Sequence, residues 1–125
     1  MRDMPLRILL GKLSADWMAI IGEIARLDDG LEIVGVLESP LDILLRTAEL
    51  RPDMVLLPQL RGGGEPGICS HFLLEYPNVE LLLLPGTPGA NSVLRMVLRK
   101  ENCGEASKHL LHGLMQAAFK AGDSS

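Results

Sequence analysis

Residues 51–58 read Arg51-Pro52-Asp53-Met54-Val55-Leu56-Leu57-Pro58, and this stretch decides the fold. Pro52 ends any preceding helix, because proline disfavours the helical conformation in the residue before it. Residues 54–57 form a continuous apolar run of strand length, which is typical of a strand covered on both faces. Pro58 has no amide donor and marks the strand's carboxyl end. Open α/β sheets bind their ligands at such ends, so this is the first place to look for a site.

The composition is that of an ordinary globular protein. The chain has 125 residues, of which 47% are hydrophobic and 22% charged, enough for one domain with a sizeable core. Only 3% of the residues are aromatic, so we expect an aliphatic core. The formal net charge of −4 argues against nucleic-acid binding by the chain as a whole, because phosphate contacts need clustered Lys and Arg.

Cysteine spacing and hydropathy exclude further classes. Cys69 and Cys103 do not form a CxxC motif, so the sequence offers neither a zinc ribbon nor a redox pair. No apolar run approaches the roughly 18 residues that cross a bilayer. We therefore expect a cytoplasmic protein with no cofactor, no metal and no membrane contact.

Apolar runs of strand length alternate with amphipathic stretches along most of the chain. Ser14 and Ser39 stand where N-caps are expected, and Pro40 occupies a first helical position. The pattern predicts strands at 6–10, 31–36, 53–57, 79–84 and 93–98, and helices at about 15–27, 40–50, 68–75 and 102–120. The helix at 40–50 is expected to turn Leu41, Leu44, Leu45 and Ala48 toward the sheet.

The last third of the chain has the weakest pattern. Residues 85–89 are rich in Pro and Gly, so a helix after the fourth strand should be short or absent. Asn102 and Glu105 fit the N-cap and third position of the last helix. We expect an α/β protein, a flavodoxin-like three-layer sandwich with a five-stranded parallel sheet in the order 2-1-3-4-5.

Three stretches together resemble the receiver domains of bacterial two-component response regulators. They are residues 31–36, 51–57 and 76–84, which are similar to that family's second, third and fourth strands. The similarity extends from Leu6 to about Phe119. It implies a single receiver-like domain over 1–125, with an ordered core at about 6–120, short flexible termini and a role in phosphorelay signalling.

The functional positions of receivers carry other residues here. The magnesium-binding acidic pair corresponds to Gly11 and Lys12, and neither offers the side-chain oxygen that a hard cation needs. The phosphoryl-accepting aspartate corresponds to Pro58, which has no nucleophile. The switch Thr or Ser corresponds to Pro85. The resemblance therefore implies a degenerate pseudo-receiver that cannot be phosphorylated at this position.

Basic residues gather in one segment, at Arg95, Arg99 and Lys100. Lys100, or Arg99 with a one-residue shift, is the counterpart of the lysine after the receivers' fifth strand. The cluster is either a partner surface or a strand edge protected by charge. Lys12 also has two readings, because it either replaces the metal's charge or is an exposed loop lysine.

Two weaker patterns are explained without a binding site. Gly62-Gly63-Gly64 lacks the spacing of a phosphate-binding loop and is interpreted as a linker. His109 and His112 lie three residues apart near Cys103, but too few ligands are present for a zinc site, so we expect ordinary helix-surface residues.

Two functional hypotheses follow. The first is a non-catalytic signalling module that docks on a partner protein or on a second copy, independently of phosphorylation. The alternative is a small-ligand sensor that uses the carboxyl edge of the sheet, around Gly11, Pro58, 62–64 and 85–89. We do not expect an enzyme, because no nucleophile has an adjacent base and no cofactor motif is present.

Overall fold

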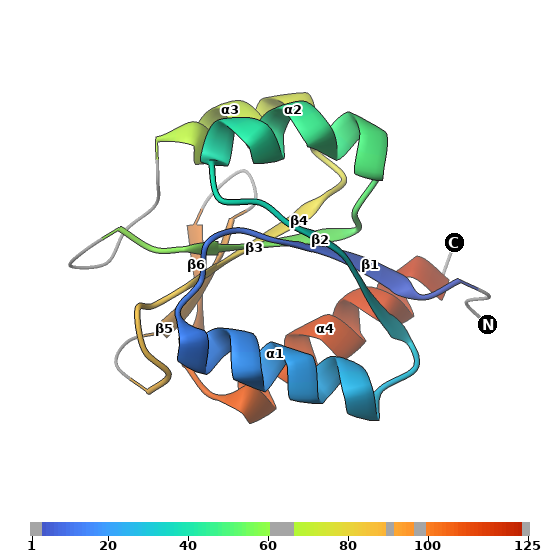
Figure 1. Ribbon diagram of the computed structural model, residues 1–125, viewed down its shortest axis with the longest axis vertical. Helices are drawn as coiled ribbons and strands as arrows, with labels where there is room; N and C mark the ends of the chain where they lie inside the picture. The colour runs from blue at the N-terminus through green and yellow to red at the C-terminus, as the bar shows by residue number, and fades with distance from the viewer. Residues whose placement is uncertain (1–3, 61–66, 90–91, 97–99, 124–125) are drawn as a thin grey trace.

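The computed structural model describes residues 4–60, 67–89, 92–96 and 100–123 (Figure 1). Ten elements follow one another in the described chain. They are β1 (Leu6–Leu10), α1 (Ala15–Leu27), β2 (Leu31–Val36), α2 (Pro40–Leu50), β3 (Met54–Pro58), α3 (Ile68–Glu75), β4 (Glu80–Leu84), β5 (Ser92–Met96), β6 (Lys100–Glu105) and α4 (Lys108–Asp123).

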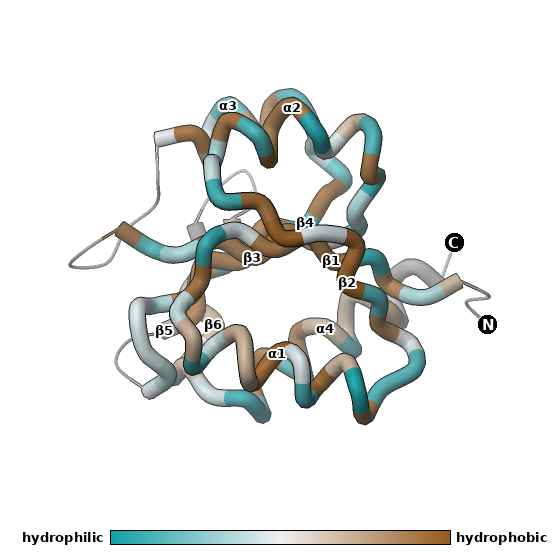
Figure 2. Tube along the Cα trace, in the orientation of Figure 1, coloured by the Kyte–Doolittle hydropathy of each residue, from teal (hydrophilic) through white to brown (hydrophobic). Residues whose placement is uncertain are grey.

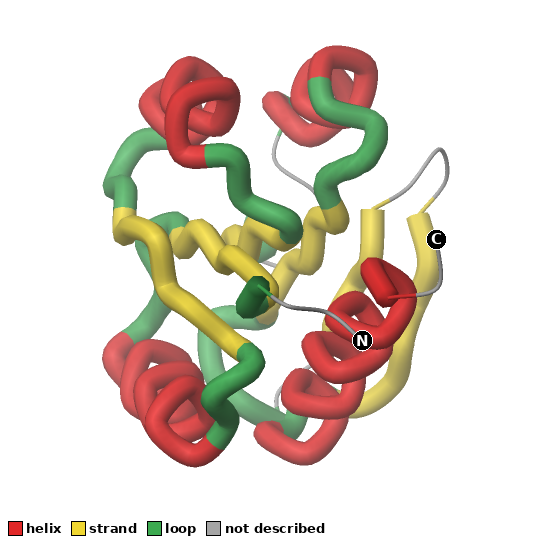
Figure 3. The backbone as a smooth tube through the Cα atoms, turned by 90° about the vertical axis from the view of Figure 1, so that its right-hand side faces the viewer, coloured by secondary structure: helices red, strands yellow, loops and turns green. Residues whose placement is uncertain are grey.

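The elements form three layers around one mixed sheet. The sheet has six strands in the order β2-β1-β3-β4-β5-β6. Helices α2 and α3 cover one face, and α1 and α4 cover the other (Figures 1 and 3). The central strands are the most apolar part of the trace, whereas the helices alternate between polar and apolar residues (Figure 2). The expected α/β sandwich is therefore present.

The prediction of a five-stranded parallel sheet is wrong. Strands β1 to β4 are parallel, with β1 between β2 and β3, but β5 runs antiparallel to β4 and β6 antiparallel to β5. A parallel crossover needs a dozen or more residues, and the connection from Leu84 to Ser92 is shorter than that. The described part of this connection, residues 85–89, contains no helix, as expected for a fourth helix that is short or absent.

The predicted start of the last helix is also wrong. Residues 100–105 form β6, and Gly104 has a φ of 124°, which an α-helix does not allow. The helix begins after Ser107 instead, whose hydroxyl accepts the backbone N–H of Leu110 at 3.1 Å. Asn102 and Glu105 therefore do not cap this helix.

The earlier helices begin where the sequence predicts. Ser14 accepts the backbone N–H of Trp17 at 3.4 Å, and Ser39 stands directly before Pro40. Each layer of helices then closes its own half of the core. On the α1 and α4 side the fully buried side chains include Trp17, Ile21, Ile24, Leu111 and Met115; on the other side they include Ile43, Cys69 and Phe72.

Helix α2 turns a different face to the sheet from the one predicted. Ile43 and Thr47 are its buried residues, while Leu41 and Leu45 are 58% and 66% exposed. Burial of Thr47 is tolerated because its hydroxyl donates a hydrogen bond to the carbonyl of Ile43 at 2.5 Å. The four residues predicted to face the sheet therefore come from two faces of the helix. Of these, Leu41, Leu45 and Ala48 face solvent.

None of the helices in the described ranges combines the length and the apolar character that crossing a bilayer requires.

Candidate functional site

The structure gathers Gly11, Pro58 and Pro85 at the carboxyl edge, the edge of the sheet at which β1, β3 and β4 end. Gly11 follows β1 and donates its backbone N–H to Leu56 at 2.8 Å. Pro58 ends β3 and lies opposite Leu84, the residue before Pro85. These three residues are therefore neighbours, as the sequence predicts.

Lys100 is not part of this group. It pairs with Met96, which in turn pairs with Leu81 near the start of β4. Lys100 therefore begins β6 at the opposite, amino edge of the sheet. Its expected position after a fifth parallel strand is wrong, because the chain makes an antiparallel hairpin there.

The space beside Gly11 is filled by side chains of the core. A Cβ atom placed on Gly11 would lie 2.7 Å from Cδ2 of Leu57 and 3.3 Å from Cδ1 of Ile43. Leu57 is itself buried in the cluster below α2 and α3, so its methyl group has little room to move. An acidic side chain at this position would have to displace that packing.

Trp17 closes the same edge from the other face of the sheet. This fully buried side chain donates its indole N–H to the carbonyl oxygen of Pro85 at 2.6 Å. Nearby, Gln59 donates its side-chain amide to Leu83 at 3.1 Å and its backbone N–H to Leu84 at 2.8 Å. The backbone carbonyls of Leu83, Leu84 and Pro85 thus accept hydrogen bonds from other residues of the chain.

Lys12 and Arg95, two charged residues singled out in the sequence, have separate surroundings in the structure. Lys12 is exposed and forms no ion pair within the part of the chain that the structure describes, which supports the reading as a loop lysine. Arg95 forms an ion pair with Glu80 of the neighbouring strand at 3.6 Å. Arg99 lies outside the described residues, as does the Gly62-Gly63-Gly64 stretch.

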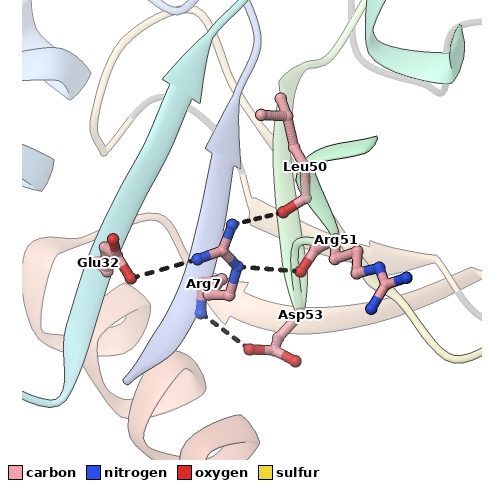
Figure 4. Close-up of polar contacts among 5 residues, drawn as sticks. All are labelled: Arg7, Glu32, Leu50, Arg51 and Asp53. Atoms are coloured by element: carbon pink, nitrogen blue, oxygen red, sulfur yellow. Dashed lines mark hydrogen bonds and ion pairs between the residues drawn. The ribbon is translucent and has the colours of Figure 1, made fainter. Parts of the chain in front are cut away.

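The amino edge holds a polar network that the sequence did not indicate (Figure 4). Arg7 donates from Nη2 to the carbonyl of Leu50 at 2.6 Å and from Nε to that of Arg51 at 3.3 Å. Its Nη1 lies 3.5 Å from a carboxylate oxygen of Glu32, and its backbone N–H donates to Asp53 at 2.9 Å. The guanidinium therefore caps the carbonyl end of α2, where positive charge is favoured.

Two depressions lie near this edge. One, of about 480 Å³, is lined by Thr47, Ala48, Arg51, Pro52, Asp53, Tyr76, Asn78 and Val79. The other, of about 290 Å³, is lined by Pro77, Asn78, Val79, Glu80 and Arg95. These cavities lie at the end of the sheet opposite to the predicted site.

Two side-chain contacts join α4 to α1 and to the residue that follows it. His112 Nε2 lies 2.9 Å from a carboxylate oxygen of Asp28, and Lys108 lies 2.9 Å from Glu23. The hydrogen bond from His112 lowers the pKa of Asp28 below its ordinary value. His112 is therefore more than a helix-surface residue, because it ties the last helix to the end of the first.

Within the described residues, no group of three or more His, Cys, Asp and Glu side chains is arranged to hold a metal ion. Cys69 is buried and Cys103 half-buried, and the two do not form a disulfide bond.

Trp17 and Arg7 were not predicted as site residues, although the sequence carries a signal for each. Trp17 stands in the first turn of a helix that follows a strand, which places its ring near the carboxyl edge, and a buried indole N–H needs a partner. Arg7 is the only charged residue within the apolar run of β1, and such a residue is retained where something can bond it.

A scan against protein-family models and a search of curated proteins find no match to this chain.

Proposed function

We propose that this protein is a non-catalytic, receiver-like interaction module, not an enzyme, that acts in the cytoplasm by docking on a protein partner. It would do so independently of phosphorylation. The receiver relationship rests on the sequence resemblance, and the order β2-β1-β3-β4 of the parallel strands is compatible with it. The antiparallel hairpin of β5 and β6 is a departure from the all-parallel sheet that the resemblance implies.

The observation that supports the proposal most is the packing around Gly11. The position that would carry a metal-binding carboxylate has Leu57 at 2.7 Å from where its Cβ would lie. Pro58 supplies no nucleophile, and Pro85 presents a carbonyl that already accepts the indole of Trp17. These residues build a packed edge, which favours a structural role over phosphoryl transfer.

The test is incubation of the purified full chain with Mg²⁺ and acetyl phosphate, followed by intact mass spectrometry. An active receiver domain in the same reaction serves as the positive control. We expect the control to gain a phosphoryl group and this chain to gain none. A stoichiometric adduct on this chain, mapped to any residue of the carboxyl edge, would refute the proposal.

A small-ligand sensor is the second candidate, favoured by the cavity of about 480 Å³ at the amino edge. A ligand there would contact Ala48, Arg51 and Asn78 instead of the predicted carboxyl edge. A thermal-shift screen with nucleotides and metabolites tests it, because a ligand that binds only the folded state raises the melting temperature. Stabilisation that is lost in an Asn78→Ala variant would support this candidate over the first.

A further inference from the structure

Helix α2 carries an apolar stripe on the side that faces away from the core. Leu41, Leu45 and Ala48 are spaced so that they lie on one face of the helix, opposite Ile43 and Thr47. All three are exposed, Leu41 by 58% and Leu45 by 66%. Single exposed leucines are common on protein surfaces, but an aligned set on one helix is typical of a contact surface.

Opposite charges flank this stripe. Glu38 precedes α2 and Arg51 follows it, and both residues are exposed. Neither forms an ion pair within the described residues, and Figure 4 shows the Arg51 side chain pointing away from Arg7. By contrast, Arg46 and Glu49 pair with each other on the same helix at 3.5 Å. Asp42, in the first turn of α2, is also exposed and forms no ion pair within the described residues, so the charges left for a partner are negative at the start of the stripe and positive at its end.

This pattern is complementary to itself. If two α2 helices pack antiparallel about a two-fold axis beside Leu45, Leu41 of each copy lies near Ala48 of the other, and Glu38 lies near Arg51. The small side chain of Ala48 permits close approach, and the cavity that begins there offers space for an incoming leucine. Antiparallel helices also bring opposite dipole ends together.

We propose that the outward face of α2 binds a second copy of this chain, through the Leu41, Leu45 and Ala48 stripe and two reciprocal Glu38 to Arg51 ion pairs. The inference rests on the proposed interaction function and names its partner. A stable dimer buries about 800 Å² per copy, which three side chains alone do not provide. We therefore expect a reversible dimer whose population depends on concentration.

Sedimentation velocity over a concentration series of the full chain tests the inference. The wild-type protein should shift from monomer to dimer, and Leu45→Glu should remain monomeric because it places two negative charges at the axis. The matched control is Leu27→Glu, since Leu27 is 62% exposed but lies at the end of α1 on the other face of the sheet. Wild-type protein that stays monomeric throughout, or equal effects of the two variants, would overturn the inference.

A charge exchange tests the antiparallel arrangement separately. Glu38→Arg and Arg51→Glu should each weaken the dimer several-fold, since close charge pairs at interfaces are coupled. The double variant should recover most of the wild-type affinity, and no recovery would refute the reciprocal pairing. Circular dichroism confirms that each variant is folded. A monomeric wild type that gains no phosphoryl group would refute the dimer and leave the non-catalytic function standing.

Discussion

Replacement of Gly11 by alanine tests the claim that the carboxyl edge is packed shut. The added methyl group would lie 2.7 Å from Cδ2 of Leu57, closer than carbon atoms approach, and 3.4 Å from the carbonyl oxygen of Leu56. Leu57 must therefore move within a core in which it is only 3% exposed. Gly22 provides the matched control, because a Cβ at that position of α1 meets nothing within 4 Å.

Two opposing effects set the change in the free energy of unfolding caused by Gly11→Ala. Overpacking a filled core by one methyl group costs about 1–3 kcal/mol. Alanine restricts the unfolded chain more than glycine does, and this effect stabilises the folded protein by about 0.4–1 kcal/mol. We therefore expect Gly11→Ala to lower the free energy of unfolding by about 1–2 kcal/mol. Gly22→Ala should raise it by about 0.5–1 kcal/mol, because alanine is the better helix former.

Urea denaturation followed by far-ultraviolet circular dichroism measures both variants on one scale. The two substitutions are chemically identical, so their difference reports the space around each glycine. If Gly11→Ala is as stable as Gly22→Ala, the carboxyl edge has room for a side chain and is not packed shut.

Three further predictions test other contacts. Trp17→Phe removes the indole donor and leaves the buried carbonyl of Pro85 unpaired. We expect the free energy of unfolding to fall by about 2–4 kcal/mol in the same denaturation assay. An unchanged free energy of unfolding would show that the hydrogen bond does not stabilise the fold. Arg7→Met removes the charged donors at the carbonyl end of α2 and should cost about 1–3 kcal/mol, whereas Arg46→Met, which breaks only an exposed ion pair, should cost less than about 1 kcal/mol. The pKa of Asp28 is lowered in the folded state, so its contribution is fully present above the ordinary value of 3.8 and is lost as the pH falls through the lower folded value. As the pH falls below 3.8, stability should therefore fall more steeply in the wild type than in Asp28→Asn, and parallel curves would contradict this assignment.

The parallel half of the fold was predictable because its signals are local. Residues 54–57 form a short apolar run between prolines, which is typical of a covered strand, and Ser39 with Pro40 predicts a helix start from capping chemistry. The direction of β5 has no such local signal, because the alternation of side chains is the same in parallel and antiparallel strands. Only the short connection from Leu84 to Ser92 carries that information, because it is too short for a parallel crossover.

The sequence did not predict strand β6 or the buried face of α2, and the reasons differ from those for β5. Residues 100–105 have no apolar alternation, so β6 is specified by its pairing with β5 and not by its own pattern. In α2, leucine occurs on both faces, and the buried threonine that decides the orientation looks like a surface residue in sequence.

The sequence predicted that Gly11, Pro58 and Pro85 lie near one another, but it did not predict the contacts around them. The neighbouring places of Gly11, Pro58 and Pro85 follow from the order of the parallel strands. The contact of Trp17 with Pro85 joins residues far apart in the chain, and only the packing of α1 against the sheet creates it.

Native mass spectrometry of the protein purified from its own host tests the central claim most directly, because one spectrum reports both the number of chains and any retained small molecule. The account predicts a complex, either two copies of this chain or one copy with a partner protein, without added mass on the chain. A monomer that carries a defined extra mass would contradict it and would favour a ligand-binding role.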